Sequence, residues 1–232
     1  MPNSSKLLWM SDLHLDQSNQ FSYEKLLYNL NILEYDAAVI TGDTAASESL
    51  AQHLNAITDA CYPKPVYIVL GNHDFYNSSI KKTKIEVGKI CKSISNVYHL
   101  QEYGPIWINN NTILLGHHGW PDAQCGWGVK TIIDSPDFNA IDDFRPLDKR
   151  GQFNLMGRLG FESTRFIRKN LNAFLSKSTK IIVATHVPPF LTSAYYNGKL
   201  CGRCHSPHYV NSNMGGMLIG KAQERKNHQK RF

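Results

Sequence analysis

Residues 66–74 read VYIVLGNHD, and this segment combines the two features that decide the fold. Its first five residues are apolar and rich in β-branched and aromatic side chains, as in a short buried strand. Gly71 ends the apolar run, and Asn72, His73 and Asp74 follow it. These polar residues are of types that bind metals or transfer protons. The segment therefore predicts a buried strand with reactive side chains at its carboxyl end.

Three further segments repeat this arrangement of an apolar run followed by polar residues. Residues 7–10 precede Ser11-Asp12-Leu13-His14, residues 37–40 precede Thr41-Gly42-Asp43, and residues 181–184 precede Thr185-His186. Ligands of open α/β sheets bind at the carboxyl ends of the strands, so four such strands would bring their polar residues to one edge. We therefore predict a metal site at that edge, formed by Asp12, His14, Asp43, Asn72, His73 and His186.

The rest of the pattern predicts an α/β layered fold with mixed sheets. Helices are expected where apolar residues recur at helical spacing, over residues 22–34, 78–94 and 155–174. Short strands separated by turn residues, as in a meander or hairpin, are expected over residues 97–100, 106–108 and 112–115. A last helix is expected from about Asn213. Residues 1–220 would form one domain, and residues 221–232 a basic polar tail.

Composition places the chain among ordered proteins without a membrane span. It has 232 residues, of which 42% are hydrophobic and 19% charged, which suits one domain with its own core. No apolar stretch approaches the ~18 residues that a membrane span needs. The N-terminus lacks the cationic, apolar and small-residue regions of a signal peptide. We therefore expect a cytoplasmic protein with no membrane partner.

The formal net charge of +6 is concentrated near the end of the sequence. Residues 221–232 hold five basic residues and one glutamate, a net charge of +4, so the remaining 220 residues carry +2. A basic segment of this kind is more often solvated than bound to a polyanion. A nucleic-acid partner is therefore possible but not favoured, and the oligomeric state is left open.

Cysteines suggest no disulfide framework. Their number, five, is odd, and reduced thiols are expected in a cytoplasmic protein. Cys201, Cys204 and His205 match the pattern of c-type haem attachment, and with His208 they resemble half of a zinc knuckle. A surface loop with incidental cysteines is preferred over both interpretations.

The predicted site residues suit a two-metal centre. Asp12 and His14, two residues apart, would project to the same side of an extended strand end. A carboxylate oxygen together with an imidazole nitrogen suits Mn, Fe or Zn. Asp43 has two oxygens and could bridge two ions, and Asn72 and His186 could bind the second ion. His73 could then protonate a leaving oxygen, with Asp74 fixing its tautomer.

In their order along the chain, the four blocks resemble the signature of the calcineurin-like metallophosphoesterase superfamily, over residues 6 to about 220. The resemblance implies a four-layer α/β/β/α sandwich and phosphoester hydrolysis by metal-bound hydroxide at a dinuclear centre. By position, it assigns Asp12 and His14 to the first metal, Asp43 to a bridge, and Asn72 and His186 to the second metal. It gives His73 the role of catalytic histidine.

One block of the superfamily pattern is missing. The superfamily has a Gly-His-x-His block shortly after a helix like the one expected from Asn213, and residues 221–232 contain no such block. His228 is the only histidine there, and it is given little weight as a ligand. We expect a chain truncated before its last strands, with weak metal binding and little activity.

The substrate is not encoded in these motifs. A small phosphorylated substrate is expected, and a nuclease, a cyclic-nucleotide phosphodiesterase and a catalytically impaired protein of the same fold remain alternatives. Specificity is expected in two long loops, residues 119–150 and 187–212. Their aromatic residues could stack on a base or sugar, or fix the loops to the body: Trp120, Trp127, Tyr195 and Tyr196. His117 and His118 could equally face substrate or be structural.

Overall fold

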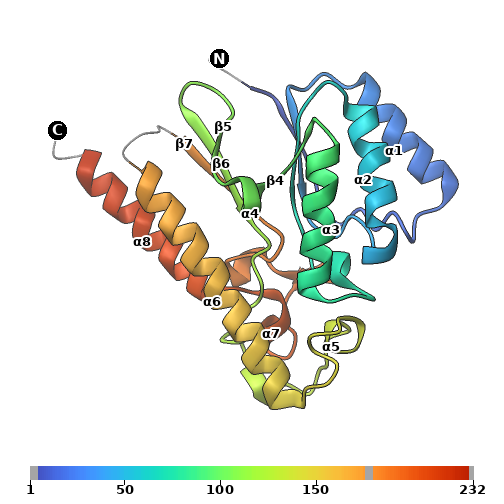
Figure 1. Cartoon of the computed structure of the whole chain (residues 1–232). Coiled ribbons are helices and arrows are strands. Elements are labelled where there is room, and N and C mark those ends of the chain that lie inside the picture. The colour runs from blue at the N-terminus through green and yellow to red at the C-terminus, as the bar shows by residue number, and fades with distance from the viewer. Residues whose placement is uncertain (1–4, 176–179, 230–232) are drawn as a thin grey trace.

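A parallel sheet of four strands carries most of the predicted site segments. The computed structural model describes residues 5–175 and 180–229, with side chains up to residue 226 (Figure 1). The strands pair in the order β1-β2-β3-β4, with all neighbours parallel: β1 Leu7–Met10, β2 Ala37–Thr41, β3 Val66–Val69 and β4 Val97–His99. Because the strands run the same way, the loops after β1, β2 and β3 meet at one edge of the sheet.

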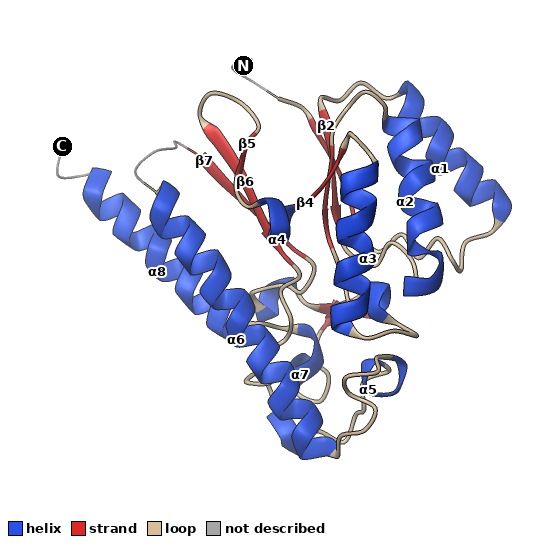
Figure 2. Cartoon of the chain, in the orientation of Figure 1, coloured by secondary structure: helices blue, strands red, loops and turns tan. Residues whose placement is uncertain are grey.

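Three helices connect these strands and cover one face of the sheet (Figure 2): α1 Gln20–Ile32, α2 Ser47–Cys61 and α3 Ile80–Ser93. Asn19 caps α1 and Ser79 caps α3, each accepting a hydrogen bond from a backbone N–H of the first turn. Helix α2 was not expected from the sequence, although Leu50, Leu54 and Ile57 are spaced along one helical face and are buried in the largest core cluster.

A second, mixed sheet faces the first. It has the order β5-β6-β7, with β5 antiparallel and β7 parallel to β6: β5 Ile106–Trp107, β6 Thr112–His117 and β7 Lys180–Thr185. One buried cluster joins the two sheets, because it contains Val39 and Val69 from the first and Leu114 and Ala184 from the second. The end of β7 therefore reaches the same region as the ends of β1 to β3.

Two long helices pack on the other side of the second sheet (Figure 2): α6 Lys149–Phe174 and α8 Ser212–Gln229. Leu115 of β6 shares a buried cluster with Ile167 of α6 and Met214 of α8. Shorter elements interrupt the two long loops: α5 Asp137–Ala140, α7 Ser206–Tyr209, the hairpin of β8 Tyr195–Tyr196 with β9 Lys199–Leu200, and single-turn 3-10 helices at Gly128–Lys130 and Leu191–Ser193. A further 3-10 turn, His73–Phe75, follows β3.

The α/β class with parallel and mixed sheets is confirmed, and the expected hairpin is present as β5 paired antiparallel with β6. The strand at residues 97–99 does not extend it to a meander, because β4 pairs in parallel with β3 and the short helix α4 (Leu100–Tyr103) leads from the first sheet to the second. Residues 221–229 continue α8 as helix, and most of residues 221–226 are exposed, while residues 230–232 of the expected basic tail lie outside the described residues. The side chain of His228 lies outside the described residues. Within the described ranges, no helix is both long and apolar enough to cross a membrane.

Helix α6 contains two glycines that provide a matched test of its packing. A Cβ atom at Gly160 would lie 2.6 Å from the carbonyl oxygen of Pro121, whereas one at Gly157 would lie 3.4 Å from that of Asp122. We expect Gly160→Ala to lower the free energy of unfolding by about 1–3 kcal/mol, because backbone must move. Gly157→Ala should be neutral or stabilising by up to about 1 kcal/mol, through helix propensity. Urea denaturation of both variants measures the difference, and equal effects would contradict this packing.

Candidate metal centre

The loops that follow β1 and β2 are bonded to each other along their backbones. The N–H of Asp12 donates to the carbonyl of Gly42 at 3.1 Å, and that of His14 donates to the carbonyl of Asp43 at 3.0 Å. Asp12, His14 and Asp43 all have left-handed backbone conformations, with φ of 54°, 42° and 52°. Such conformations are uncommon outside glycine and concentrate at functional sites. Three of the predicted ligands therefore sit on strained backbone held by neighbouring strand ends.

Two glycines allow the strand-end loops to approach each other. A Cβ atom at Gly42, where φ is +91°, would lie 2.6 Å from both the backbone nitrogen of Gly71 and Nδ1 of His186. A Cβ atom at Gly71 would overlap the carboxylate of Asp43. The glycines that precede Asp43 and Asn72 in the sequence are thus required by close packing of three loops.

Asp74 holds two of these loops together. Its carboxylate is fully buried and accepts four backbone hydrogen bonds of 2.7–3.1 Å, from the N–H groups of Asp43, Thr44, Ala45 and Gly71. Burial and the charge of Asp43 raise the pKa of Asp74 to about 7, against the N–H donors from Gly71 and Ala45, which lower it. Both oxygens are therefore engaged with backbone, and neither contacts the His73 ring as the sequence analysis expected.

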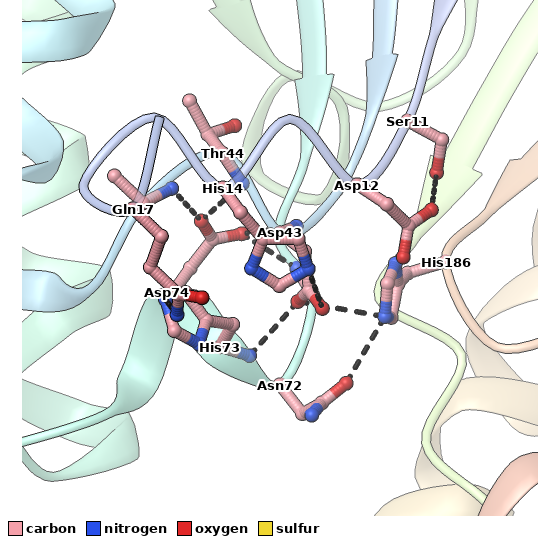
Figure 3. Close-up of polar contacts among 12 residues, drawn as sticks. Ser11, Asp12, His14, Gln17, Asp43, Thr44, Asn72, His73, Asp74 and His186 are labelled. Carbon is pink, nitrogen blue, oxygen red and sulfur yellow. Dashed lines mark hydrogen bonds and ion pairs between the residues drawn. The ribbon is translucent and has the colours of Figure 1, made fainter. Parts of the chain in front are cut away.

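Asp43 lies at the centre of the predicted ligands (Figure 3). Its Oδ2 is 3.6 Å from Nε2 of His14, and its Oδ1 is 3.5 Å from Nε2 of His186. Burial raises the pKa of Asp43, although the two imidazoles act in the opposite direction. Each oxygen of this buried carboxylate thus faces a different histidine, which is the arrangement that a bridge between two cations needs.

His186 and Asn72 turn lone pairs toward the same point. Nδ1 of His186 is 2.8 Å from the carbonyl of Thr41, so it carries the proton, and Nε2 lies 3.0 Å from Oδ1 of Asn72. The Asn72 amide is oriented by Asp137, which accepts a hydrogen bond from Nδ2 at 2.8 Å. Three acceptors therefore converge, including Oδ1 of Asp43. Oδ1 of Asp43 also accepts the backbone N–H of His73 at 2.8 Å, and a second proton on His186 or a cation would face the lone pairs of His186 and Asn72.

The electrostatics agree with this need for positive charge. Burial by itself lowers the pKa of His186, but the carboxylates of Asp43 and Asp12 raise it above its usual value overall. On the other side of Asp43, donor atoms of Asp12, His14 and Asp43 lie within 4.8 Å of one another, a spacing that a metal ion can bridge. The mixed oxygen and nitrogen donors fit a divalent ion such as Mn, Fe or Zn. Their assignment as ligands stays a prediction.

His73 differs from its expected position. Its ring is buried, lies edge-on to the ring of His14 at 4.6 Å between centroids, and places Nε2 2.9 Å from Oδ2 of Asp16. It does not line the cleft that contains Asp43 and His186. Partial burial raises the pKa of Asp16, but the hydrogen bond that its carboxylate accepts from the His73 ring and the charge of that ring lower it overall. His14, Asp16 and His73 also form a possible metal-binding group.

A cleft of about 700 Å³ opens over the predicted ligands, and both long loops contribute to its wall. Asp137 comes from the first loop, and Tyr195, His208 and Tyr209 come from the second, while Trp9 of β1 completes the rim. The cleft is lined by Asp12, Asp43 and Asp137, and by no lysine or arginine of the described residues. In the absence of cations, its charge is therefore negative.

The remaining predicted residues lie elsewhere. Trp120 is buried and packs against Phe75 and Phe144, so it fixes its loop, whereas Trp127 is exposed outside the cleft. His117 and His118 are buried and line no part of the cleft. Tyr196 lies outside it too, stacked on His205. Among the described residues, Cys201, Cys204 and His205 belong to no group able to hold a metal ion.

Sequence reasoning missed two carboxylates that support the site. Asp16 lies two residues after His14, just as His14 lies two residues after Asp12. This spacing is a signal that could have identified Asp16. Asp137 lies 65 residues from Asn72 in an irregular loop, and no local pattern marks it. Its contact with Asn72 exists only in the folded chain.

Asp74 provides a test of how the loops are held. We expect Asp74→Asn to lower the free energy of unfolding by about 1–3 kcal/mol or more, because an amide nitrogen cannot accept the backbone N–H bonds. Asp142→Asn, which removes an exposed carboxylate paired with Arg145 at 3.1 Å, should cost less than about 1 kcal/mol. Urea denaturation of both variants decides this, and similar stabilities would contradict the structural role.

Comparison with known proteins agrees with the arrangement of the strand ends. No curated protein sequence matches the chain. The family model for calcineurin-like phosphoesterases matches residues 5–211, a segment that begins before β1 and ends after α7. It therefore includes Asp12, Asp43, Asn72 and His186 and the strands that precede them. Because the match covers most of its length, the chain belongs to the calcineurin-like phosphoesterase family.

Proposed function

We propose that this protein hydrolyses phosphoesters of small molecules with two divalent metal ions bound around Asp43. The observation that carries the proposal is the charge of the cleft. Three carboxylates line it, those of Asp12, Asp43 and Asp137, and no lysine or arginine of the described residues balances them. Such a cleft repels a phosphoester until cations reverse its charge. Two divalent ions add four positive charges and do so.

The ligand positions follow from the donors that converge. Asp12 and His14 would hold one ion, Asn72 and His186 the other, and the two oxygens of Asp43 would serve both. When bound, the ions would supply positive charge to the phosphoryl oxygens and activate water near neutral pH. Each ion would have three protein ligands, with Asp43 counted twice, which leaves positions open as catalytic sites require. Asp137 would keep the oxygen of Asn72 facing its ion.

His73 would supply the proton to the leaving oxygen, with Asp16 as its partner. The carboxylate of Asp16 lies 2.9 Å from Nε2 of His73 and orients the ring. Asp16 therefore takes the part that the sequence analysis gave to Asp74. Because the ring lies beside His14 and outside the cleft, its action requires a turn of the side chain toward the substrate.

The cleft favours a small substrate over nucleic acid. Its volume of about 700 Å³ suits a phosphorylated molecule of moderate size, and exposed rings of Trp9 and Tyr195 at its rim could contact an organic group. A nuclease needs cationic side chains that follow the phosphate backbone, and the cleft lining has none among the described residues. The four-layer α/β/β/α arrangement is part of the same proposal, supported by the two facing sheets and the helices outside them.

Metal binding and turnover of residues 1–232 test the proposal. For residues 1–232 we expect Mn²⁺-dependent hydrolysis of p-nitrophenyl phosphate that is weak, because each ion has only three protein ligands among the predicted residues. Asp43→Asn should remove most bound Mn²⁺ and most activity, since a neutral amide bridges two cations poorly. Metal content is measured after equilibrium dialysis. Asp142→Asn is the control and should retain both properties.

Two results would contradict these expectations. Unchanged Mn²⁺ content in Asp43→Asn would exclude the bridging role. Full occupancy by two ions with rapid turnover in the unmodified chain would show that other residues complete the site, and His208, which lines the cleft, would be examined first.

The roles of His73 and Asp16 are separated from metal binding by a second pair of variants. His73→Ala should keep its Mn²⁺ content and lower turnover by roughly 10²–10⁴-fold, the usual contribution of a general acid. Asp16→Asn should lower turnover less, because the imidazole remains. Equal loss of Mn²⁺ in both variants would instead assign them, with His14, to a metal site.

A further inference from the structure

A second cleft, of about 650 Å³, lies between α3, α4 and α6 and has no part in the proposed metal centre. It is lined by Lys84 of α3, Gln101 of α4 and His117 of β6, and by Arg165 and Lys169 of α6, with Trp120 in its wall. Figure 1 shows α4 between α3 and α6. None of these residues belongs to the motifs of the sequence analysis, apart from the histidine and the tryptophan.

The cationic side chains of this cleft lack anionic partners. Lys84, Arg165 and Lys169 form no ion pair within residues 5–175 and 180–226, and Glu162 is the only carboxylate that lines the cleft. Burial lowers the pKa of Lys84, although Glu102 and Glu162 act to raise it. A partly buried ammonium without an ion pair has lost hydration that no contact replaces. The cleft therefore carries an excess of two positive charges that an anion would balance.

Unpartnered buried polar atoms gather around the same cleft. Among the described residues, nine buried side-chain nitrogen or oxygen atoms have no hydrogen-bond partner, and five of them belong to His99, Gln101, His118 and Trp120. Gln101 and Trp120 line the cleft directly, with Oε1 of one and Nε1 of the other unpaired. A buried polar atom that stays unpaired has lost hydration that no hydrogen bond replaces. The two atoms in residues that line the cleft indicate a ligand that donates to Oε1 of Gln101 and accepts from Nε1 of Trp120.

The histidines beside Lys84 are neutral donors. Burial, with the charge of Lys84 as a further cause, lowers the pKa of His99 to about 4 and that of His117 to about 3. Nδ1 of His117 accepts a hydrogen bond from the N–H of Gly119 at 3.2 Å, so the proton of the neutral ring is on Nε2. His117 can thus donate to an oxygen anion, while the positive charge of the cleft comes from lysine and arginine.

We propose that this cleft binds a small organic phosphate that carries hydroxyl groups. A phosphate dianion matches the excess of two positive charges and can accept hydrogen bonds from Lys84, Arg165 and Lys169. A hydroxyl group of the ligand can donate to Oε1 of Gln101, and an oxygen can accept from Nε1 of Trp120. The volume admits a sugar phosphate or a nucleotide. Trp120 also borders a small cavity beside Asn72 and His186, so the cleft and the metal centre are neighbours with separate linings.

Calorimetric titration of the full chain in EDTA tests this site without the metal centre. The probes are ribose 5-phosphate, inorganic phosphate and acetate. We expect one site per chain, binding ribose 5-phosphate more tightly than inorganic phosphate, and acetate without measurable binding. Lys84→Met and Arg165→Met should each weaken binding about 10-fold or more, the loss expected for one charge-assisted hydrogen bond. Thermal melting confirms that the variants fold.

Matched controls separate this proposal from its alternatives. Arg158→Met removes an exposed arginine of α6 that does not line the cleft, and Asp43→Asn alters the metal centre, so both should retain ribose 5-phosphate binding. An absence of binding to the unmodified chain would overturn the proposal. Equal weakening by Arg158→Met and Arg165→Met would also overturn it, because binding would then reflect the general charge of α6. If a single-stranded oligonucleotide bound more tightly than ribose 5-phosphate, and Arg158→Met and Arg165→Met weakened its binding equally, the surface would instead be one that binds nucleic acid.

Discussion

The buried carboxylate of Asp74 is the constraint on which the candidate metal centre depends. It gathers backbone N–H groups from the loop after β2 and from the start of the loop after β3, which otherwise have no regular partners at the sheet edge. With those loops fixed, Asp43 can remain buried between two histidines. The loop after β1 is then placed by backbone bonds to Gly42 and Asp43. A single anion thus organises three strand ends, and its protonation or removal would loosen all of them.

The facing of two sheets brings the fourth strand end into this arrangement. β7 does not pair with β1, β2 or β3, and His186 follows it from the other sheet. Val39, Val69 and Ala184 pack in the cluster between the sheets, which sets the distance at which His186 meets Asp43 and Asn72. The apolar core and the polar site therefore depend on the same strands, because these strands bury their apolar side chains and are followed by the predicted ligands.

The molecule has two clefts of opposite charge. The cleft over Asp43 is lined by carboxylates and needs cations, whereas the cleft beside α6 is lined by cations and needs an anion. In the sequence, residues 221–232 carry +4 of the net charge of +6. Helix α6, however, contains six lysines and arginines and one glutamate, so a large share of the charge lies on one face of the folded domain. None of these cations lines the cleft over Asp43, so a basic protein has an acidic candidate active site.

The sequence alone determined the strands and the residue types at their ends, since each is encoded within about ten consecutive residues. An apolar run followed by Gly71-Asn72-His73-Asp74 specifies both a buried strand and donors at its carboxyl end. Tertiary structure decided which atoms those donors contact. Asp16 lies 57 residues from His73, and Asp137 lies 65 residues from Asn72, so neither pairing leaves a local pattern. The contacts of Asp74 were likewise decided by the tertiary structure. Its carboxylate oxygens accept from backbone N–H groups rather than from the adjacent imidazole, because buried N–H groups of the loops need hydrogen-bond partners.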